Sequence, residues 1–195
     1  MGLSTRWLSQ VGVLSALSII LMFLSFPLPF LPGFLKLDLA ELPALIGLFT
    51  LGPWGAVAIE GVKNLIHLTG TRTFAVGELA NFLIGTALIM GTYGGTKLGW
   101  GLRSSLATGV IVMTVCAGLV NLFILIPLYA LVLGIPVEAL VKIGQTTNPK
   151  IVDLTSLILW GIVPFNLIKG SLIGVAALAV LPRLKRGSHS SIGEK

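Results

Sequence analysis

The sequence predicts an all-α integral membrane protein with six transmembrane helices and cytoplasmic N- and C-termini. Its 195 residues are 55% hydrophobic and only 10% charged, and the mean hydropathy is +1.00. This composition is typical of membrane proteins and not of soluble domains. Apolar stretches close to the roughly 20 residues of a membrane crossing recur along the chain. The cations between them gather on one side of the membrane once these stretches are counted as crossings.

Six apolar stretches are the predicted crossings, and they cover residues 7–26, 39–51, 54–68, 78–98, 106–133 and 154–181. The second and third are shorter than a full crossing, and Gly52 and Pro53 separate them. A re-entrant hairpin is therefore the alternative to two crossings at this point. Six crossings are preferred because the loops on both flanks then follow the expected charge asymmetry.

Charge asymmetry sets the predicted orientation. With six crossings both termini lie on one side, which carries the cations Arg6, Lys97, Arg103, Arg183, Lys185 and Arg186. The opposite loops mix both signs, with Lys36, Asp38, Glu41, Arg72, Lys142, Lys150 and Asp153. The positive-inside rule places the termini in the cytoplasm. The formal charge of +6 thus indicates topology and contact with anionic lipid, not a nucleic-acid partner.

The chain is predicted to form one transmembrane domain over residues 1–186, followed by a polar cytoplasmic tail over residues 187–195. The first apolar stretch begins at Trp7 without a cleavage site, so we interpret it as retained. The single Cys116 lies within an apolar stretch. It therefore offers neither a disulfide nor a cysteine-based metal site.

The strongest functional signal is the pair Asn166 and Lys169 in the middle of the last apolar stretch. A spacing of three puts them on one helical face. Lys169 lies about 18 Å from the helix end near residue 181, too far for its side chain to reach the interface. A charge at this depth costs at least about 2.5 to 3.5 kcal/mol unless a partner or a wet cavity compensates it, so we expect a functional site here.

Asn121 is the expected companion of this pair. Counting along the alternating crossings puts Asn121 and Asn166 at the same depth, about 22 Å above the cytoplasmic side. Pro127 and Pro164 each remove a helical hydrogen bond nearby, so kinks at matched positions would open a pocket. Two amides and an ammonium suit a ligand whose edge carries both donors and acceptors. The alternative is that these are ordinary membrane-helix prolines.

The third stretch carries a polar stripe on one helical face, formed by Glu60, Lys63, Asn64 and His67. Glu78 and Asn81 open the next stretch from the same outer side. The interior is therefore expected to be more polar toward the outside. The alternative for Glu60 is a pairing with Lys63 or Asn64 that only holds helices together. No second His or Cys stands near His67 in the sequence, so it is not expected to bind a metal.

The segment 26–38 contains three prolines and three phenylalanines and is predicted to lie outside the membrane. A stiff apolar loop above a pocket suits a lid or an aromatic contact for a flat ring. The alternative is a plain connection between two helices.

Several motifs are missing. The chain has no phosphate-binding Gly-x-x-x-x-Gly-Lys-Ser/Thr loop, so it cannot hydrolyse ATP by itself. It also lacks His-Glu-x-x-His, Gly-x-Ser-x-Gly and a catalytic cysteine with a placed histidine, so it is not expected to be an enzyme. Gly12 and Ala16 form a small-residue groove on the first helix, where another helix can approach closely.

Strings over residues 12 to about 182 resemble the riboflavin-specific S component of energy-coupling factor (ECF) transporters, the small membrane subunit that captures a vitamin. The strings are Phe26-Pro-x-Pro, Leu31-Pro-x-x-Leu-Lys36-x-Asp38, Leu42-Pro-Ala44, Gly52-Pro-x-x-Gly55, Glu60-x-x-Lys63-Asn64, Gly77-x-x-Ala80-Asn81-Phe82, Asn121 and Pro164-Phe-Asn-x-Ile-Lys-Gly170. The last string and the proline-rich first loop are the most specific.

The resemblance implies a six-helix bundle that binds riboflavin from outside. Asn121, Asn166 and Lys169 would bind the edge of the flavin ring, and the loop from Phe30 through Leu35 to Lys36 would cover it. The hydroxylated ribityl chain needs polar partners, for which Lys63, Asn64, Glu78 and Asn81 are available. Gly12 and Ala16 would dock a transmembrane coupling subunit that works with two ATPases.

The leading hypothesis is therefore a riboflavin-binding subunit in a prokaryotic cell membrane that depends on an ATP-driven partner. Riboflavin or its phosphate FMN would be the transported ligand, with no other cofactor. One alternative is a self-sufficient secondary transporter of a small vitamin or other organic solute, with Glu60, Lys63 and Lys169 as a relay. Another is a structural membrane protein whose polar residues only lock helices together.

Overall fold

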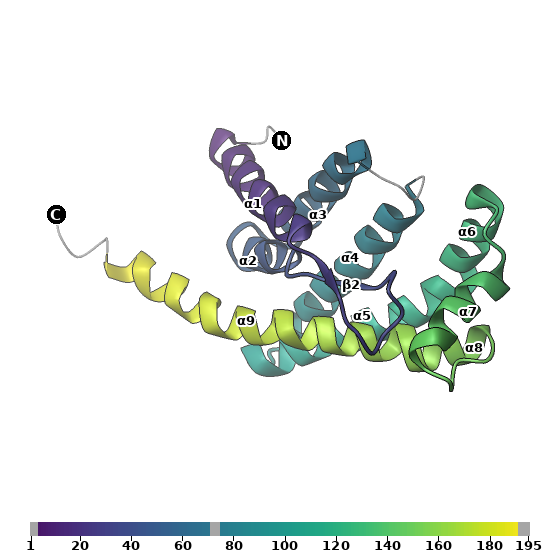
Figure 1. The fold of residues 1–195 in the computed structure, drawn as a ribbon. Helices are drawn as coiled ribbons and strands as arrows, with labels where there is room; N and C mark the ends of the chain where they lie inside the picture. The colour runs from purple at the N-terminus through teal and green to yellow at the C-terminus, as the bar shows by residue number, and fades with distance from the viewer. Residues whose placement is uncertain (1–3, 71–74, 191–195) are drawn as a thin grey trace.

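A computed structural model describes residues 4–70 and 75–190, which form a set of helices and one short hairpin (Figure 1). The helices are α1 (Thr5–Phe23), α2 (Leu42–Leu51), α3 (Pro53–His67), α4 (Val76–Lys97), α5 (Leu102–Val120), α6 (Ile126–Leu133), α7 (Val137–Thr147), α8 (Leu154–Leu157) and α9 (Val163–Ser190). A 3-10 turn covers Leu68–Gly70, and π-helical segments cover Asn121–Leu125 and Ile158–Ile162. Strands β1 (Phe26–Pro27) and β2 (Lys36–Leu37) pair antiparallel, with Phe26 opposite Leu37.

Within the described residues, four continuous helical stretches are long and apolar enough to cross a membrane: Thr5–Phe23, Val76–Lys97, Leu102–Leu133 and Leu154–Leu184. They coincide with the first, fourth, fifth and sixth predicted stretches to within a few residues. The second and third predicted stretches form α2 and α3, which are also helical but have only 10 and 15 residues. The prediction of a helical chain with several candidate membrane-spanning helices is confirmed.

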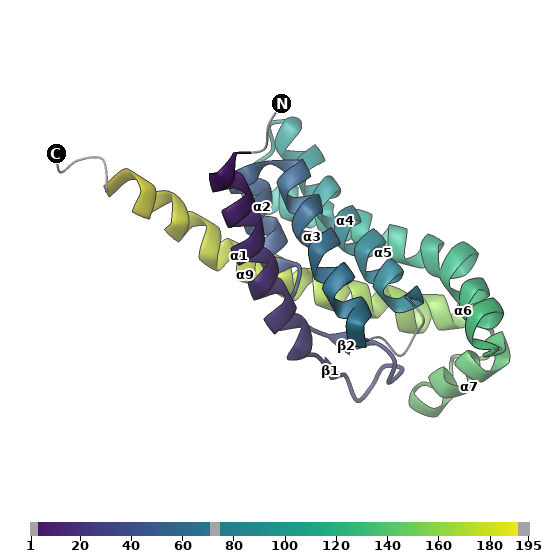
Figure 2. The same ribbon diagram turned by 90° about the horizontal axis from the view of Figure 1, so that it is seen from above.

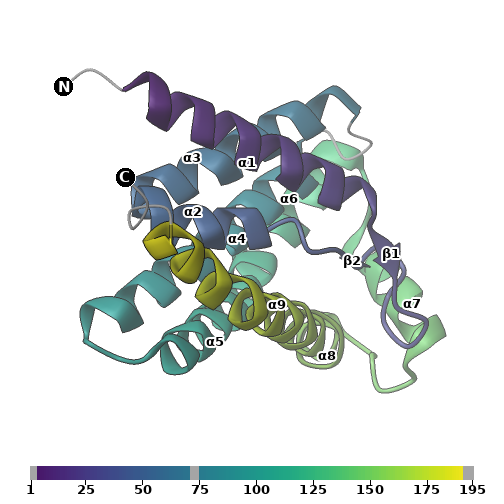
Figure 3. The ribbon, with the colours of Figure 1, turned by 90° about the vertical axis from the view of Figure 1, so that its left-hand side faces the viewer.

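The two ends of the described chain lie at the same end of the molecule. The first turn of α1 and the last turns of α9 lie away from the hairpin, α6 and α7, and the views in Figures 1, 2 and 3 agree on this. Helix α9 continues to Ser190, so residues 187–190 of the predicted tail are helical, and residues 191–195 lie outside the described part. Arg72 also lies outside it.

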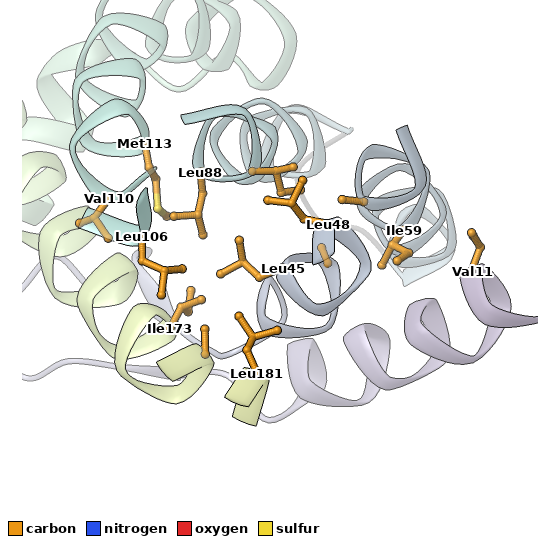
Figure 4. Packing of buried hydrophobic residues seen from close by; sticks show 14 residues of the cluster. Val11, Leu45, Leu48, Ile59, Leu88, Leu106, Val110, Met113, Ile173 and Leu181 are labelled. Atoms are coloured by element: carbon orange, nitrogen blue, oxygen red, sulfur yellow. The ribbon is translucent and has the colours of Figure 1, made fainter. Parts of the chain in front are cut away.

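The main core lies at the end of the bundle near the termini, where α1, α2, α3, α4, α5 and α9 meet (Figure 4). Leu45 of α2 is completely buried there, beside Leu88, Leu106 and Ile173 from three other helices. Helices α4 and α5 approach through glycine. A methyl group added at Gly95 would come within 2.7 Å of the Cα atom of Ser105, so only a glycine permits this spacing.

Both π-helical segments precede a predicted kink proline. Proline has no N–H, so Pro127 and Pro164 cannot bond the carbonyls of Phe123 and Trp160. In the structure the N–H of Ile126 bonds the carbonyl of Asn121, and the N–H of Val163 bonds that of Ile158. These wider turns carry the strain of the missing bonds, and π-bulges are frequent at functional sites. The predicted irregularities are confirmed at matched positions.

Asp153 begins the last helical stretch through a capping box. Its carboxylate accepts hydrogen bonds from the backbone N–H of Ser156 at 2.7 Å and from the hydroxyl of that residue at 2.7 Å. These bonds lower the pKa of Asp153, because they stabilise its charged form. A fixed start helps to hold the following π-helical segment in place.

Gly52 makes the corner between α2 and α3, with φ +82° and ψ 178°. This region is open almost only to glycine, because a Cβ atom would clash with the backbone.

We expect Gly52→Ala to destabilise the folded protein by about 1 to 3 kcal/mol. The matched control is Gly94→Ala in α4, where an added methyl group meets no atom within 4 Å. Thermal unfolding of both variants in detergent checks this. Equal unfolding temperatures for the two would contradict the strain assigned to the corner.

Candidate functional site

A cavity of about 490 Å³ lies between the hairpin loop, the middle of the bundle and α7. The loop contributes Phe34, Leu35 and Lys36, and α7 contributes Leu140 and Ile143. The volume falls within the roughly 300 to 1,000 Å³ usual for small-molecule sites. We did not expect α7 from the sequence, and it forms one side of this cavity.

The three polar residues singled out in the last two crossings all line this cavity. Asn121 begins one π-helical segment, while Asn166 and Lys169 follow the other on α9. Asn166 and Lys169 are only 3% and 4% exposed, so the apolar bundle surrounds both. The two amides, which we expected at equal depth, therefore line the same cavity.

Each amide is held by a carbonyl of its own helix. Asn121 Nδ2 donates to the Ala117 carbonyl at 2.8 Å, and Asn166 Nδ2 donates to the Ile162 carbonyl at 2.8 Å. Each side chain keeps one further N–H and its carbonyl oxygen for another partner. The two amides thus offer fixed donors and acceptors to a ligand.

The loop between β1 and β2 is packed against α9. Leu31 and Leu37 are buried together with Phe165, and Ile168 packs against the same cluster. This apolar contact holds Leu35 and Lys36 at the cavity. The loop therefore takes part in the cavity wall, as expected of a lid.

Lys169 is not an isolated charge. Its Nζ donates to Asp38 Oδ2 at 3.1 Å and to Glu41 Oε1 at 3.1 Å. We had counted Asp38 and Glu41 among the mixed charges of the outer loops, but they are only 7% and 1% exposed. Both carboxylates turn inward, where they neutralise the buried ammonium.

The ion pairs continue into α3. Glu41 Oε1 also accepts from Lys63 Nζ at 3.2 Å, and Lys63 contacts Glu60 Oε2 at 2.7 Å. Lys63 and Glu60 are completely buried. One carboxylate oxygen of Glu41 thus joins the cavity lysine to the predicted Glu60–Lys63 pair. We call Asp38, Glu41, Glu60, Lys63 and Lys169 the buried ion network.

Asp38 is held from both sides. Its Oδ1 accepts the N–H of Ala40 at 2.9 Å, and the Ala40 carbonyl accepts from the Ser18 hydroxyl at 2.8 Å. Burial raises the pKa of the Asp38 carboxyl, while the Lys169 ammonium and the Ala40 N–H act in the opposite direction. The loop, α1 and α9 therefore meet at this carboxyl group.

The cavity collects only part of the predicted binding set. Its lining includes Leu35, Lys36, Asn81, Asn121, Asn166 and Lys169. Phe30 is 57% exposed and is not among the lining residues, whereas Phe34 is. Lys63 is enclosed in the ion network and does not reach the cavity surface.

Asn64 and Glu78 line a different hollow of about 520 Å³ between α3, α4 and α6. Most of its other lining residues are apolar, among them Leu65, Leu79 and Val132, which are also partly exposed on the outer surface. Glu78 Oε1 pairs at 2.8 Å with Nδ1 of His67, which lines the cavity at Asn166 and not this hollow. Ligand sites combine apolar walls with a few converging polar groups, so the cavity at Asn166 is the better candidate.

Asp38 and Glu41 are the site residues that the sequence analysis missed. The available signal was charge balance: a buried lysine needs an acid, and the last stretch contains none.

The Gly12 and Ala16 positions lie on the exposed face of α1. The opposite face buries Val11, Ser15 and Ser18. A methyl group added at Gly12 would meet no atom within 4 Å. The small-residue groove is therefore open on the outside of the described structure.

Comparison with known proteins gives one family for most of the chain. The family model of the ECF transporter, substrate-specific component, matches residues 8–181. Riboflavin transporter RibU of Staphylococcus aureus (strain TCH60) is 35% identical over 181 residues, covering 91% of this chain and 89% of the relative. Riboflavin transporter FmnP of Bacillus subtilis (strain 168) is 31% identical over 191 residues, covering 94% of each chain.

A solved structure is also similar, described as "Structure and mechanism of the S component of a bacterial ECF transporter". The TM-score is 0.75 at 31% identity, over 93% of this chain and 96% of that one. The relatives are transporters and not enzymes, in agreement with the missing catalytic motifs.

The ion network predicts a ranking of charge-removing substitutions. Glu41→Gln should destabilise the protein most, by about 3 to 5 kcal/mol, because Glu41 neutralises two ammonium groups. Asp38→Asn should cost less, since Lys169 then keeps Glu41. Lys36→Gln, at an exposed loop position, is the control and should have little effect. Unfolding temperatures in detergent test the ranking, and a larger loss for Asp38→Asn than for Glu41→Gln would contradict it.

Proposed function

This chain belongs to the family of substrate-specific components of ECF transporters, and on that basis we propose that it binds riboflavin with high affinity from outside the cell. It would hand the ligand on only with a transmembrane coupling subunit and two ATPases. The observation that carries the proposal is the cavity in which Asn121, Asn166 and Lys169 converge, in a chain similar to two riboflavin transporters.

The chemistry of riboflavin suits this cavity. Its flat ring has apolar faces and an edge of carbonyl and N–H groups, so it needs apolar walls and a few placed polar partners. Lys169 has three N–H donors, and Asp38 and Glu41 take two of them. The third is available to a ring carbonyl without loss of either ion pair. The free amide groups of Asn121 and Asn166 would complete the edge.

The ribityl chain needs hydroxyl partners. Asn81 lines the cavity, and its Oδ1 has no hydrogen-bond partner among the described residues. Lys36 and the loop backbone would serve the same chain from the other side. In the ligand-bound protein, Lys63, Asn64 and Glu78 would be further partners of the ribityl hydroxyl groups. Phe30 would belong to the loop that closes over the ligand.

We further propose six crossings in a prokaryotic cell membrane, with cytoplasmic termini. The start of α1 and the last turns of α9 lie at the same end of the molecule, which supports an even number of crossings. Helices α2 and α3 would then cross as a short pair next to α1. Riboflavin or FMN would be the ligand, and no further cofactor would be needed.

The alternative is a self-sufficient secondary transporter of a small vitamin or other organic solute. Purified protein alone in liposomes distinguishes the two. Riboflavin accumulation driven by an ion gradient, without the coupling subunit and ATPases, would favour the alternative.

Riboflavin binding provides the central test. Detergent-purified protein should bind riboflavin with quenching of its fluorescence and with a raised unfolding temperature. Asn121→Leu should weaken binding by roughly 10- to 100-fold, because the ring edge then faces an apolar side chain. Thr108→Ala is the matched control, since Thr108 bonds its own helix in the same way at an exposed site. No binding by the wild type would refute the proposal.

Docking is tested separately on α1. The double substitution Gly12→Leu with Ala16→Leu fills the open groove, so we expect loss of the complex with the coupling subunit and of cellular riboflavin uptake. Riboflavin affinity of the isolated protein should stay unchanged. Ala179→Leu, at an exposed alanine of α9, is the control. Normal uptake by the double variant would place the docking surface elsewhere.

A further inference from the structure

The buried ion network has an unbalanced charge. It contains three carboxyl groups, on Asp38, Glu41 and Glu60, but only two ammonium groups, on Lys63 and Lys169. These five side chains are at most 5% exposed. If all five were ionised, the bundle would enclose one uncompensated negative charge. An uncompensated buried charge is so costly that the group takes up a proton instead.

The hydrogen-bond pattern shows the same deficit from another side. Three buried acceptor atoms near this network have no partner among the described residues: Glu41 Oε2, Glu60 Oε1 and Asn64 Oδ1. All three atoms are acceptors, so each of them lacks a hydrogen-bond donor. A proton on one carboxyl oxygen turns an acceptor into a donor, so one hydrogen atom balances the charge and reduces the number of acceptors that lack a donor.

The contacts indicate that Glu60 is the carboxyl group that carries this proton. Both oxygens of Asp38 are bonded, to Lys169 and to the N–H of Ala40. Glu41 contacts both ammonium groups through one oxygen. Among the described residues, the one ammonium group that Glu60 contacts is that of Lys63, at 2.7 Å, and Lys63 is shared with Glu41. Glu60 is therefore the carboxyl group with the least compensation.

Among the described residues, the elements packed against Glu60 add no charge beyond the buried ion network. On α3 it lies beside Lys63 and Asn64, whose Nδ2 is 3.5 Å from Glu60 Oε2. Glu41 is the next acid, and Lys169 and Asp38 lie beyond it in the same network. Helix α4 approaches with Gly85, where a methyl group would come within 2.6 Å of Glu60 Oε2. The buried residues of α1 are Val11, Ser15 and Ser18, none of which titrates as a carboxyl or ammonium group.

We propose that Glu60 is a proton-binding site that is occupied in the folded protein at neutral pH. The network then holds two ammonium and two carboxylate groups, and Lys63 stays shared with Glu41. Loss of the proton would make Glu60 compete with Glu41 for Lys63. Because Glu41 also holds Lys169 at the cavity wall, proton binding at Glu60 is coupled to the position of a ligand-binding ammonium.

Glu60→Gln tests the site without any ligand, because glutamine has the shape and the neutrality of protonated glutamate. We expect its unfolding temperature at neutral pH to stay close to that of the wild type. Glu41→Gln, the matched control, should lose roughly 10 °C. A comparable loss in Glu60→Gln would show that Glu60 is ionised and would overturn the proposal.

The pH dependence has a definite sign. A carboxyl group that binds a proton in the folded but not in the unfolded protein stabilises the fold less as pH rises. The wild type should therefore lose stability relative to Glu60→Gln as pH rises from about 4.3, where a glutamate of the unfolded chain ionises, up to the pH at which Glu60 itself ionises. Infrared spectra at neutral pH should show a protonated carboxyl C=O band in the wild type that Glu60→Gln lacks. Absence of that band from the wild type would overturn the proposal.

The coupling to the cavity rests on the proposed function and has its own measurement. Riboflavin affinity should weaken toward alkaline pH in the wild type and stay constant in Glu60→Gln. The same pH dependence in both proteins would overturn the coupling. Failure of riboflavin to bind at all would refute the proposed function, while the unfolding and infrared results would still decide the proton site.

Discussion

The Glu41 carboxylate is the interaction on which the rest of the site depends. One of its oxygens accepts hydrogen bonds from Lys63 and from Lys169, at 3.2 and 3.1 Å. Two ammonium groups inside an apolar bundle would otherwise repel each other and lack solvation, at a cost of several kcal/mol each. Because Glu41 stands at the start of α2, this short helix must lie between α3 and α9. The charge requirement thus fixes the arrangement of three helices.

The same requirement places the first loop at the cavity. Asp38 follows β2 directly and reaches Lys169 on α9, while Leu31 and Leu37 pack against Phe165 of the same helix. An ion pair and an apolar cluster therefore hold one segment by different means. Water weakens the ion pair more than the apolar cluster, since a wetter site screens charge but leaves apolar burial largely intact. A loop held this way can change its polar contacts while it stays close to α9.

Much of the fold follows from composition and periodicity, because apolar stretches in a membrane have few alternatives to helices. The irregular turns before Pro127 and Pro164 were predictable, since a missing N–H leaves a carbonyl that must find another partner. The meeting of Asn121 and Asn166 at one cavity was predictable by counting residues along alternating crossings. The partners of Lys169 were not predictable in this way, because Asp38 and Glu41 are more than 120 residues away in the chain. Helix α7 was missed because its 11 residues mix charged and apolar side chains outside the long apolar stretches.

A buried ion network is an expensive way to hold helices together, since apolar side chains of similar volume are often as stabilising or more so. Its presence therefore needs a reason beyond stability. Lys169 keeps one N–H donor free at the cavity surface while its charge is already neutralised by Asp38 and Glu41. A neutral ligand can accept that donor without bringing a counter-charge into the membrane. Under the proposed function, the network would make this ammonium usable for recognising an uncharged flavin ring, which a lone lysine at this depth would not be.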